Sequence, residues 1–183
     1  MKDNGNTHNI TLRKKRLSDA GNDYSWYTDR ELSSLDATSP LTMAFEDYLE
    51  DFASELYYPY PGRHSFAIET QDGKHIGNCV YYNLDTEKRE TELGIMIGNR
   101  DYWNKGFGTC AVNTLVSYIF NRTQLNRIYL KTLTNNHRAQ ECFMKCNFTK
   151  CGHMNKNGYK FLLMELYRDK WLKLQIGENP EPL

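Results

Sequence analysis

Three consecutive stretches near the middle of this chain alternate apolar and polar residues with a period of two. They cover residues 64–70, 75–83 and 89–97, and only short turns at 71–74 and 86–88 separate them. Such alternation is typical of β-strands, and tight turns join strands that run antiparallel to each other. The chain is therefore expected to fold around three consecutive antiparallel strands.

Stretches with helical spacing flank these strands on both sides. The expected helices cover residues 19–35, 42–58, 109–121 and 139–146, and the further strands cover 10–13, 127–132, 149–154 and 159–167. Ser18 is expected to cap the first helix, because serine side chains accept hydrogen bonds from helix N-termini. The order of elements predicts the α/β (α+β) class, with a single mixed, mostly antiparallel central sheet flanked by helices.

The composition agrees with one folded domain. Aromatic residues make up 13% of the 183 residues, and 23 Lys and Arg balance 23 Asp and Glu. Disordered chains have few aromatic residues and a large net charge, and nucleic-acid-binding domains carry a strongly basic surface. We therefore expect a folded core and no nucleic-acid partner. The longest basic run, Arg13–Arg16, is interpreted as the solvated end of a strand. Residues 1–8 are expected to form a flexible N-terminus, 9–170 the domain and 171–183 a C-terminal tail.

Signals for membranes, secretion and metals are weak. No segment approaches the roughly 18 consecutive apolar residues of a membrane helix. The first 20 residues contain no signal-peptide core, and five cysteines without a dense framework fit a reducing compartment. A cytoplasmic protein without a membrane partner is expected. Cys142, Cys146, Cys151 and His153 lie close together, but their spacing is not that of the common zinc motifs, so no metal is expected.

A glycine turn, Asn104-Lys105-Gly106-Phe107-Gly108-Thr109, separates the third of the consecutive strands from the next helix. Glycines allow a backbone to approach a phosphate closely, and the first turn of a helix offers unpaired N–H groups. The turn is therefore a candidate pyrophosphate cradle. The P-loop pattern is absent, and the dinucleotide pattern is rejected because Gly106 lies about ten residues after its strand and the next strand ends without an acid. On these glycines alone, a turn without a ligand is equally consistent.

Two motifs in the second half of the chain carry a resemblance to a known family. The first is Trp103-Asn104-Lys105-Gly106-Phe107-Gly108, and the second is Asn136-His137-Arg138-Ala139 followed by Phe143 and Asn147-Phe148. They resemble the phosphate-loop motif Q/R-x-x-G-x-G/A and the N-x-R-A signature of the GNAT acyltransferase superfamily, and Trp103 is a departure at the first position. The resemblance covers roughly residues 9–167. It is strongest for the branch of ribosomal-protein N-terminal and spermidine acetyltransferases, through Glu92-Leu93-Gly94-Ile95 and Tyr102-Trp103.

The resemblance implies a GNAT-like fold that uses acetyl-CoA as cosubstrate. The residues implied to surround the coenzyme are Ile95, Met96, Ile97, Trp103, Asn104, Lys105, Gly106, Phe107, Gly108, Thr109, Asn136, Arg138, Ala139 and Phe143. Residues 95–97 are expected to pair with the pantetheine amides, and an N–H near Met96 or Ile97 to bind the oxyanion. Asn136 is expected to hydrogen-bond the pantetheine arm. Arg138 and Lys105 are each either phosphate contacts or surface charges.

An amine must lose its proton before it attacks a thioester, so a general base is needed. By resemblance Glu92 is the first candidate, and Glu90, which shares its face of the strand at period two, is the second. The alternative is that both residues are solvated carboxylates on a half-exposed strand and have no catalytic role. Many relatives use a tyrosine to protonate the leaving thiolate, and Phe143 occupies that position here. Tyr159, Tyr82 or a water is expected to serve instead, unless the thiolate leaves unprotonated.

The predicted function is acetyl transfer to a primary amine by direct attack in a ternary complex. The acceptor is a protein or peptide N-terminus, a polyamine or another small amine, bound between the first two helices and the final hairpin. Asp47, Glu50, Asp51 and Glu55 either attract such a cation or form a solvated face. The alternative is a coenzyme A-binding sensor with little or no turnover, which Phe143 supports. Dimers are common in this superfamily, so the resemblance also admits a homodimer.

Overall fold

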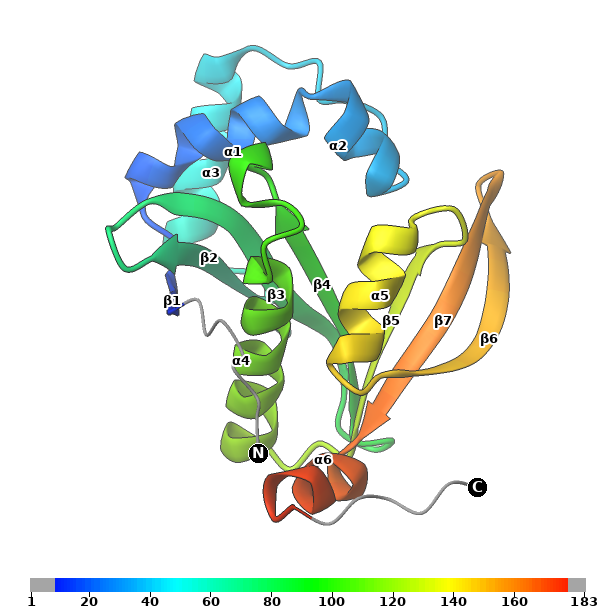
Figure 1. Cartoon of the computed structure of the whole chain (residues 1–183). Helices are drawn as coiled ribbons and strands as arrows, with labels where there is room; N and C mark the ends of the chain where they lie inside the picture. The colour runs from blue at the N-terminus through cyan, green and yellow to red at the C-terminus, as the bar shows by residue number, and fades with distance from the viewer. Residues whose placement is uncertain (1–8, 178–183) are drawn as a thin grey trace.

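The computed structural model describes residues 9–177 (Figure 1). Within them the strands are β1 (Ile10–Lys14), β2 (His64–Thr70), β3 (His75–Asp85), β4 (Glu90–Ile97), β5 (Arg127–Leu133), β6 (Thr149–Lys156) and β7 (Tyr159–Tyr167). The helices are α1 (Ala20–Tyr27), α2 (Arg30–Leu35), α3 (Phe45–Tyr57), α4 (Phe107–Arg122), α5 (His137–Lys145) and α6 (Arg168–Gln175), with short 3-10 turns η1 (Leu17–Asp19) and η2 (Arg100–Tyr102). Every predicted strand is present. The expected flexible N-terminus, residues 1–8, lies outside the described residues.

One sheet contains all of these strands, in the order β1-β2-β3-β4-β5-β7-β6. Neighbouring strands run antiparallel at every junction except one, because β4 and β5 are parallel. The prediction of a mixed, mostly antiparallel sheet flanked by helices is confirmed. The parallel pair follows from the helix α4, which carries the chain from the end of β4 back to the start of β5.

The two parallel strands separate soon after they meet. They pair only where Glu90–Glu92 of β4 lies beside Arg127–Tyr129 of β5. Beyond that point β4 runs on to Ile97 without a ladder to β5, and Figure 1 shows the two strands diverging. The far half of β4 is therefore left with one edge that no neighbouring strand occupies, and this edge faces the site described below.

Helix α4 covers one face of the sheet at its centre. Its fully buried residues recur at helical spacing along one side: Ala111, Val112, Leu115, Val116, Ile119 and Phe120. They pack against inward side chains of the strands, including Ile68, Leu93 and Ile128. Burying each large aliphatic side chain contributes about 2 kcal/mol, so this interface anchors the sheet beneath the glycine turn that precedes α4.

The prediction of one continuous helix over residues 19–35 is wrong, because the helix is interrupted at Asp29. The backbone of Asp29 is extended, and its carboxylate accepts the N–H of Leu32 at 2.9 Å, which begins a new helix at Arg30. The hydroxyl of Thr28 donates to the carbonyl of Tyr24 at 2.9 Å and closes the helix before the break. Ser18 does not act as the predicted cap.

Two other predicted helix boundaries differ from those in the structure. Helix α3 begins at Phe45 rather than at Thr42, after Ala44, which offers no side-chain cap. Residues 171–175, expected to belong to a tail, form the second half of α6 instead. The ring of Trp171 packs on Phe120 at 5.4 Å between centroids, so an apolar contact with the core holds this helix in place.

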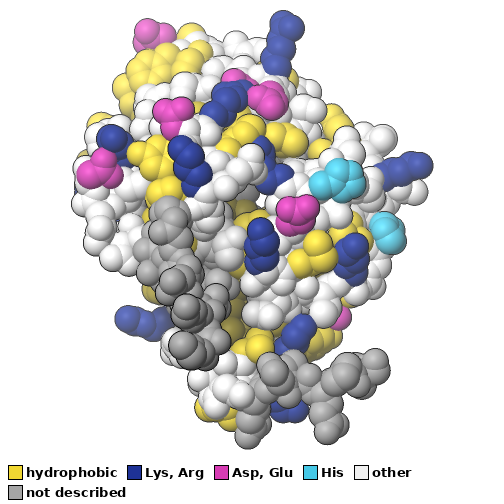
Figure 2. All heavy atoms as spheres, in the orientation of Figure 1, with side chains coloured by type: hydrophobic (Ala, Val, Ile, Leu, Met, Phe, Trp, Pro, Cys, Tyr) yellow, Lys and Arg dark blue, Asp and Glu magenta, His cyan; other side chains and the backbone are white. Residues whose placement is uncertain are grey.

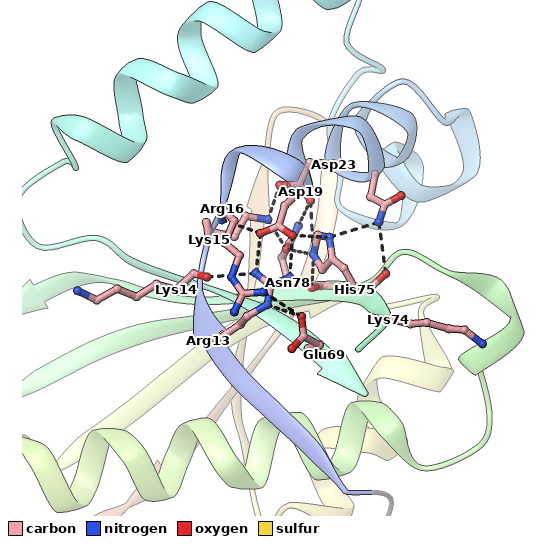
Figure 3. Close-up of polar contacts among 12 residues, drawn as sticks. Arg13, Lys14, Lys15, Arg16, Asp19, Asp23, Glu69, Lys74, His75 and Asn78 are labelled. Atoms are coloured by element: carbon pink, nitrogen blue, oxygen red, sulfur yellow. Dashed lines mark hydrogen bonds and ion pairs between the residues drawn. The ribbon is translucent and has the colours of Figure 1, made fainter. Parts of the chain in front are cut away.

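A buried ionic network ties the helical N-terminal region to the sheet (Figure 3). Arg13 donates to both carboxylate oxygens of Asp19 at 2.7 Å, and Lys15 contacts the carboxylate of Asp23. The basic run Arg13–Arg16 is therefore not simply solvated. The side chains of Arg13 and Lys15 turn toward Asp19 and Asp23 and are each 11% exposed, whereas that of Arg16 is 63% exposed and lies 3.8 Å from the carboxylate of Glu69.

The surface drawn in Figure 2 mixes acidic and basic side chains over the visible face, in keeping with the balanced charge of the chain. Among residues 9–177, none of the helices combines the length and the apolar character that crossing a membrane requires.

Candidate active site

A pocket of about 550 Å³ opens where β4 and β5 part. Its walls come from α2 and the loop after it, the ends of β4 and β5, the loop before α4, the start of α5 and the β6–β7 hairpin. Leu93 of β4 packs in the core with α4, and by strand alternation its neighbour Glu92 faces the opposite side of the sheet. Because both line the pocket, the pocket passes from one face of the sheet to the other.

Most of the residues predicted from the sequence meet in this pocket. Those that line it are Glu92, Ile95, Met96, Ile97, Trp103, Asn104, Gly106, Gly108, Thr109, Asn136, Arg138, Ala139, Phe143 and Tyr159. Glu90, Lys105 and Phe107 do not line it. Phe107 turns toward the core and makes an edge contact with Tyr102 at 4.9 Å between centroids.

The glycine turn has a backbone that few other residues could adopt. Gly106 has φ +87° and Asn104 has φ +57°, both in the left-handed region that favours glycine and tolerates asparagine. Gly106 occupies the N-cap position, and α4 begins at the next residue. The N-terminal N–H groups of a 16-residue helix therefore open beside the pocket, with the positive end of its dipole.

Gly108 differs from Gly106, because its backbone is an ordinary helical one and its surroundings leave room for little more than a methyl group. A Cβ at this position would lie 3.4 Å from Sγ of Cys142 and 3.8 Å from Cγ1 of Ile97. The turn thus packs closely between α5 and the end of β4, and a larger side chain here would extend into the pocket. Cys142 itself lines the pocket, and the residues that the structure describes contain no His, Cys, Asp and Glu grouping fit to hold a metal.

Trp103, where the sequence departs from the phosphate-loop motif, joins three parts of the pocket. Its Nε1 donates to the carbonyl of Ile97 at 2.6 Å. The guanidinium carbon of Arg138 lies 3.4 Å from the centroid of its ring, and burial lowers the pKa of that guanidinium. Arg138 is therefore stacked against the turn from the start of α5, rather than extended freely into solvent.

Glu92 is buried at the bottom of the pocket, with 5% of its surface exposed. The side-chain nitrogen of Asn83 donates to its Oε2 at 2.9 Å, and the ammonium of Lys131 contacts its Oε1. Tyr82 of β3 lies opposite Glu92 in the ladder, and burial and this carboxylate both raise the pKa of its phenol. The carboxylate is held in place by side chains from two neighbouring strands.

Glu90 lies on the same face of β4 but belongs to another cluster. Arg127 donates to its Oε2 at 2.6 Å and to the carboxylate of Glu165 at 2.7 Å. This acid–base–acid set spans β4, β5 and β7 outside the pocket. Of the two predicted bases, only Glu92 therefore faces the pocket.

The face of the pocket opposite α4 contains residues that the sequence did not single out. Asp36, directly after α2, lines it, and burial raises the pKa of its carboxyl. Lys131 lines it from β5 and Lys156 from the β6–β7 hairpin. Of the predicted walls, α2, which lies within the predicted first helix, and the final hairpin line the pocket, whereas no residue of α3, the predicted second helix, does. The acidic residues of α3, by contrast, are all exposed and do not line the pocket: Asp47, Glu50, Asp51 and Glu55.

Known proteins share this sequence pattern and fold. A sequence model of the family described as Acetyltransferase (GNAT) domain matches residues 9–149. The chain belongs to the GNAT acetyltransferase family. A GNAT relative, an uncharacterized N-acetyltransferase p20 of Bacillus licheniformis, is 29% identical over 174 residues, which cover 93% of this chain and 97% of that protein. Spermidine N(1)-acetyltransferase of Vibrio cholerae is 26% identical over 130 residues, which cover 68% of this chain and 73% of that enzyme.

Solved structures of GNAT enzymes share the fold. The crystal structure of a spermidine N-acetyltransferase from Vibrio cholerae, in complex with CoA and spermine, superposes with a TM-score of 0.78. The match covers 89% of this chain and 98% of that one, at 22% identity.

Phe143 is the clearest departure from the GNAT pattern inside the pocket. It is 5% exposed, makes an edge contact with Phe148 and has no hydroxyl to donate. Tyr159 and Tyr82 line the same pocket, so hydroxyl groups are present on its other walls.

Proposed function

We propose that this protein transfers an acetyl group from acetyl-CoA to a primary amine. The observation that carries the proposal is the burial of Glu92 in the wall of the same pocket that contains the glycine turn. One pocket then offers backbone N–H groups for the phosphates of the coenzyme and a carboxylate that can accept a proton from the amine. The coenzyme enters from the side of α4 and α5, and the acceptor from the side of α2 and the β6–β7 hairpin.

For the coenzyme, we assign the pyrophosphate to residues 104–109 and the pantetheine arm to residues 95–97. One edge of β4 has no neighbouring strand beyond the point where β4 and β5 separate. We propose that its N–H and C=O groups pair with the amides of the pantetheine arm, as they would with an added strand. The side-chain oxygen of Asn136 accepts the N–H of Ala139 at 3.2 Å and caps α5. Its side-chain nitrogen is therefore the group we assign to the pantetheine arm.

For the chemistry, the amine nitrogen attacks the carbonyl carbon of the thioester while Glu92 accepts its proton, directly or through a water. A backbone N–H near Met96 or Ile97 stabilises the oxyanion of the tetrahedral intermediate. The carbon–sulfur bond then breaks, and the thiolate leaves with the electron pair. Tyr159 is our candidate for returning a proton to the thiolate, since it lines the pocket and Phe143 has no hydroxyl. Water supplies the proton if Tyr159 does not.

Phe143 also favours a second candidate function, a sensor that binds coenzyme A with little or no turnover. The two functions share a binding site and differ in whether Glu92 acts as a base. Release of free thiol therefore separates them.

The test is calorimetric titration with acetyl-CoA, coenzyme A and NAD, followed by a thiol-release assay with a panel of amines. We expect binding of acetyl-CoA and coenzyme A, none of NAD, and release of thiol that depends on the amine. Binding without release by any amine would favour the sensor. Failure to bind acetyl-CoA would overturn both functions.

The proposal includes the cytoplasm as the place of action and an amine, either a small molecule or a peptide N-terminus, as the partner. It also admits a homodimer, which a sedimentation measurement would test.

A further inference from the structure

Lys131 is the residue in closest contact with the proposed base. Glu92 of β4 lies opposite Tyr129 of β5, and Lys131, two residues further along β5, shares the same face. Its ammonium contacts Oε1 of Glu92 and lies 6.0 Å from the ring centroid of Tyr82. Both side chains line the pocket, and that of Lys131 is 30% exposed whereas that of Glu92 is 6% exposed, so the lysine is the more accessible member of the pair.

The acceptor half of the pocket holds as many cations as anions. The carboxylates that line it are those of Glu92 and Asp36, and the ammoniums are those of Lys131 and Lys156. Asp36 also feels the positive charges of Lys131 and Arg63, which oppose the effect of burial on its carboxyl pKa. Each acid that could attract a cationic substrate is therefore already faced by a cation of the protein.

This balance bears on which amines can bind. A substrate with one amine brings a single positive charge, which it gives up when the amine becomes the nucleophile. A polyamine brings further ammonium groups that keep their charge in the pocket. Like charges repel strongly where few water molecules screen them, and a half-buried ammonium is screened less than one at the surface.

We infer that Lys131 is a specificity-determining residue that restricts the acceptor to amines without a second positive charge. The favoured class is a monoamine whose remaining groups are neutral or anionic, such as the α-amine of a peptide. This inference rests on the proposed function, because it concerns the acceptor side of the same pocket.

The experiment compares kcat/KM for butylamine, glycylglycinamide and spermidine at one ionic strength, in the wild type and in Lys131→Gln. In the wild type we expect kcat/KM to be higher for the two singly charged amines than for spermidine. K131Q also removes the ion pair of Glu92 and so alters turnover with every amine. The readout is therefore the ratio of kcat/KM for spermidine to that for butylamine, which we expect to rise about tenfold in K131Q because the repelling charge is gone.

Two further variants separate charge from structure. Lys131→Arg keeps the positive charge and should keep the wild-type preference. Lys160→Gln makes the same substitution as K131Q on the neighbouring hairpin, at an exposed side chain that does not line the pocket, and should change nothing. If K131Q folds poorly, Lys156→Gln removes a pocket ammonium without touching Glu92 and should shift the preference in the same direction by about threefold.

A binding measurement makes the result independent of turnover. Calorimetry of spermidine with the coenzyme A complex should show about tenfold tighter binding to K131Q than to the wild type. The inference would be overturned if the wild type preferred spermidine. It would also be overturned if both the spermidine-to-butylamine ratio of kcat/KM and the affinity for spermidine were unchanged in K131Q. Absence of thiol release with every amine, together with the expected change in affinity, would instead overturn only the proposed transfer reaction.

Discussion

The guanidinium of Arg138 lies flat against the indole of Trp103, with its central carbon 3.4 Å from the ring centroid. This contact joins the start of α5 to the loop before α4, and the indole nitrogen extends the connection to the carbonyl of Ile97. Trp103 therefore organises the half of the pocket to which we assign the coenzyme, at the position where the family motif has a polar residue.

The Trp103 contacts predict a graded loss of coenzyme affinity. Trp103→Phe keeps the stacked ring but removes the hydrogen bond to Ile97, which should weaken acetyl-CoA binding about fivefold. Trp103→Ala also releases Arg138 and should weaken binding further. Calorimetry measures both, and an affinity for acetyl-CoA in W103A equal to that of the wild type would show that the indole has no part in the site.

Gly108 predicts a steric block. In Gly108→Val the Cβ already contacts Sγ of Cys142 at 3.4 Å and Cγ1 of Ile97 at 3.8 Å, so we expect the two further methyl groups to extend into the pocket and acetyl-CoA affinity to fall more than about tenfold. Gly21→Val is the matched control, because Gly21 also lies early in a helix but a Cβ there meets nothing within 4 Å. Equal coenzyme affinity in the two variants would refute the cradle.

The two glutamates of β4 predict opposite outcomes for the same substitution. Glu92→Gln removes the proposed proton acceptor and should lower kcat about 100-fold while acetyl-CoA still binds. Glu90→Gln, outside the pocket, should leave kcat within about threefold of the wild type, because it alters only the cluster with Arg127 and Glu165. Full turnover by E92Q would exclude Glu92 as the base.

The buried network predicts a pH-dependent stability. Burial opposes ionisation of Asp19, but the hydrogen bonds from Arg13 and from the N–H of Arg16 outweigh it and lower the pKa of the carboxyl below 3.8. Asp19→Asn breaks a buried pair and should lower the free energy of unfolding by about 3 kcal/mol at neutral pH. Because the folded-state pKa is the lower one, this contribution is complete above about pH 4 and disappears as the pH falls further.

Denaturant melts of the wild type and D19N between pH 7 and pH 2 measure this difference. The difference between the two curves should become smaller toward the acid end, as the wild-type carboxyl takes up a proton. Asp47→Asn, on the exposed face of α3, serves as the control and should change stability by less than about 0.5 kcal/mol at either pH. A difference between wild type and D19N that stayed constant down to pH 2 would contradict the assignment.

Local patterns in the sequence were sufficient to predict the features that depend on neighbouring residues. Period-two alternation located β2, β3 and β4, and the glycines of the turn before α4 were recognisable because positive φ and close packing restrict which residues can stand there. The break at Asp29 was missed, although a capping aspartate is also a local signal, because the helical pattern continues on both sides of it.

The partner of each acidic and basic side chain depends on contacts between distant parts of the chain. Glu90 and Glu92 lie two residues apart on the same face of β4, yet they have different partners. Glu90 contacts Arg127 and Glu92 contacts Lys131, and both partners lie on a strand more than 30 residues further along the chain. The parallel register of β4 and β5, and the point at which the two strands part, select those partners. Such a register is set by the packing of α4 against the sheet as a whole, so no local pattern in the sequence encodes it.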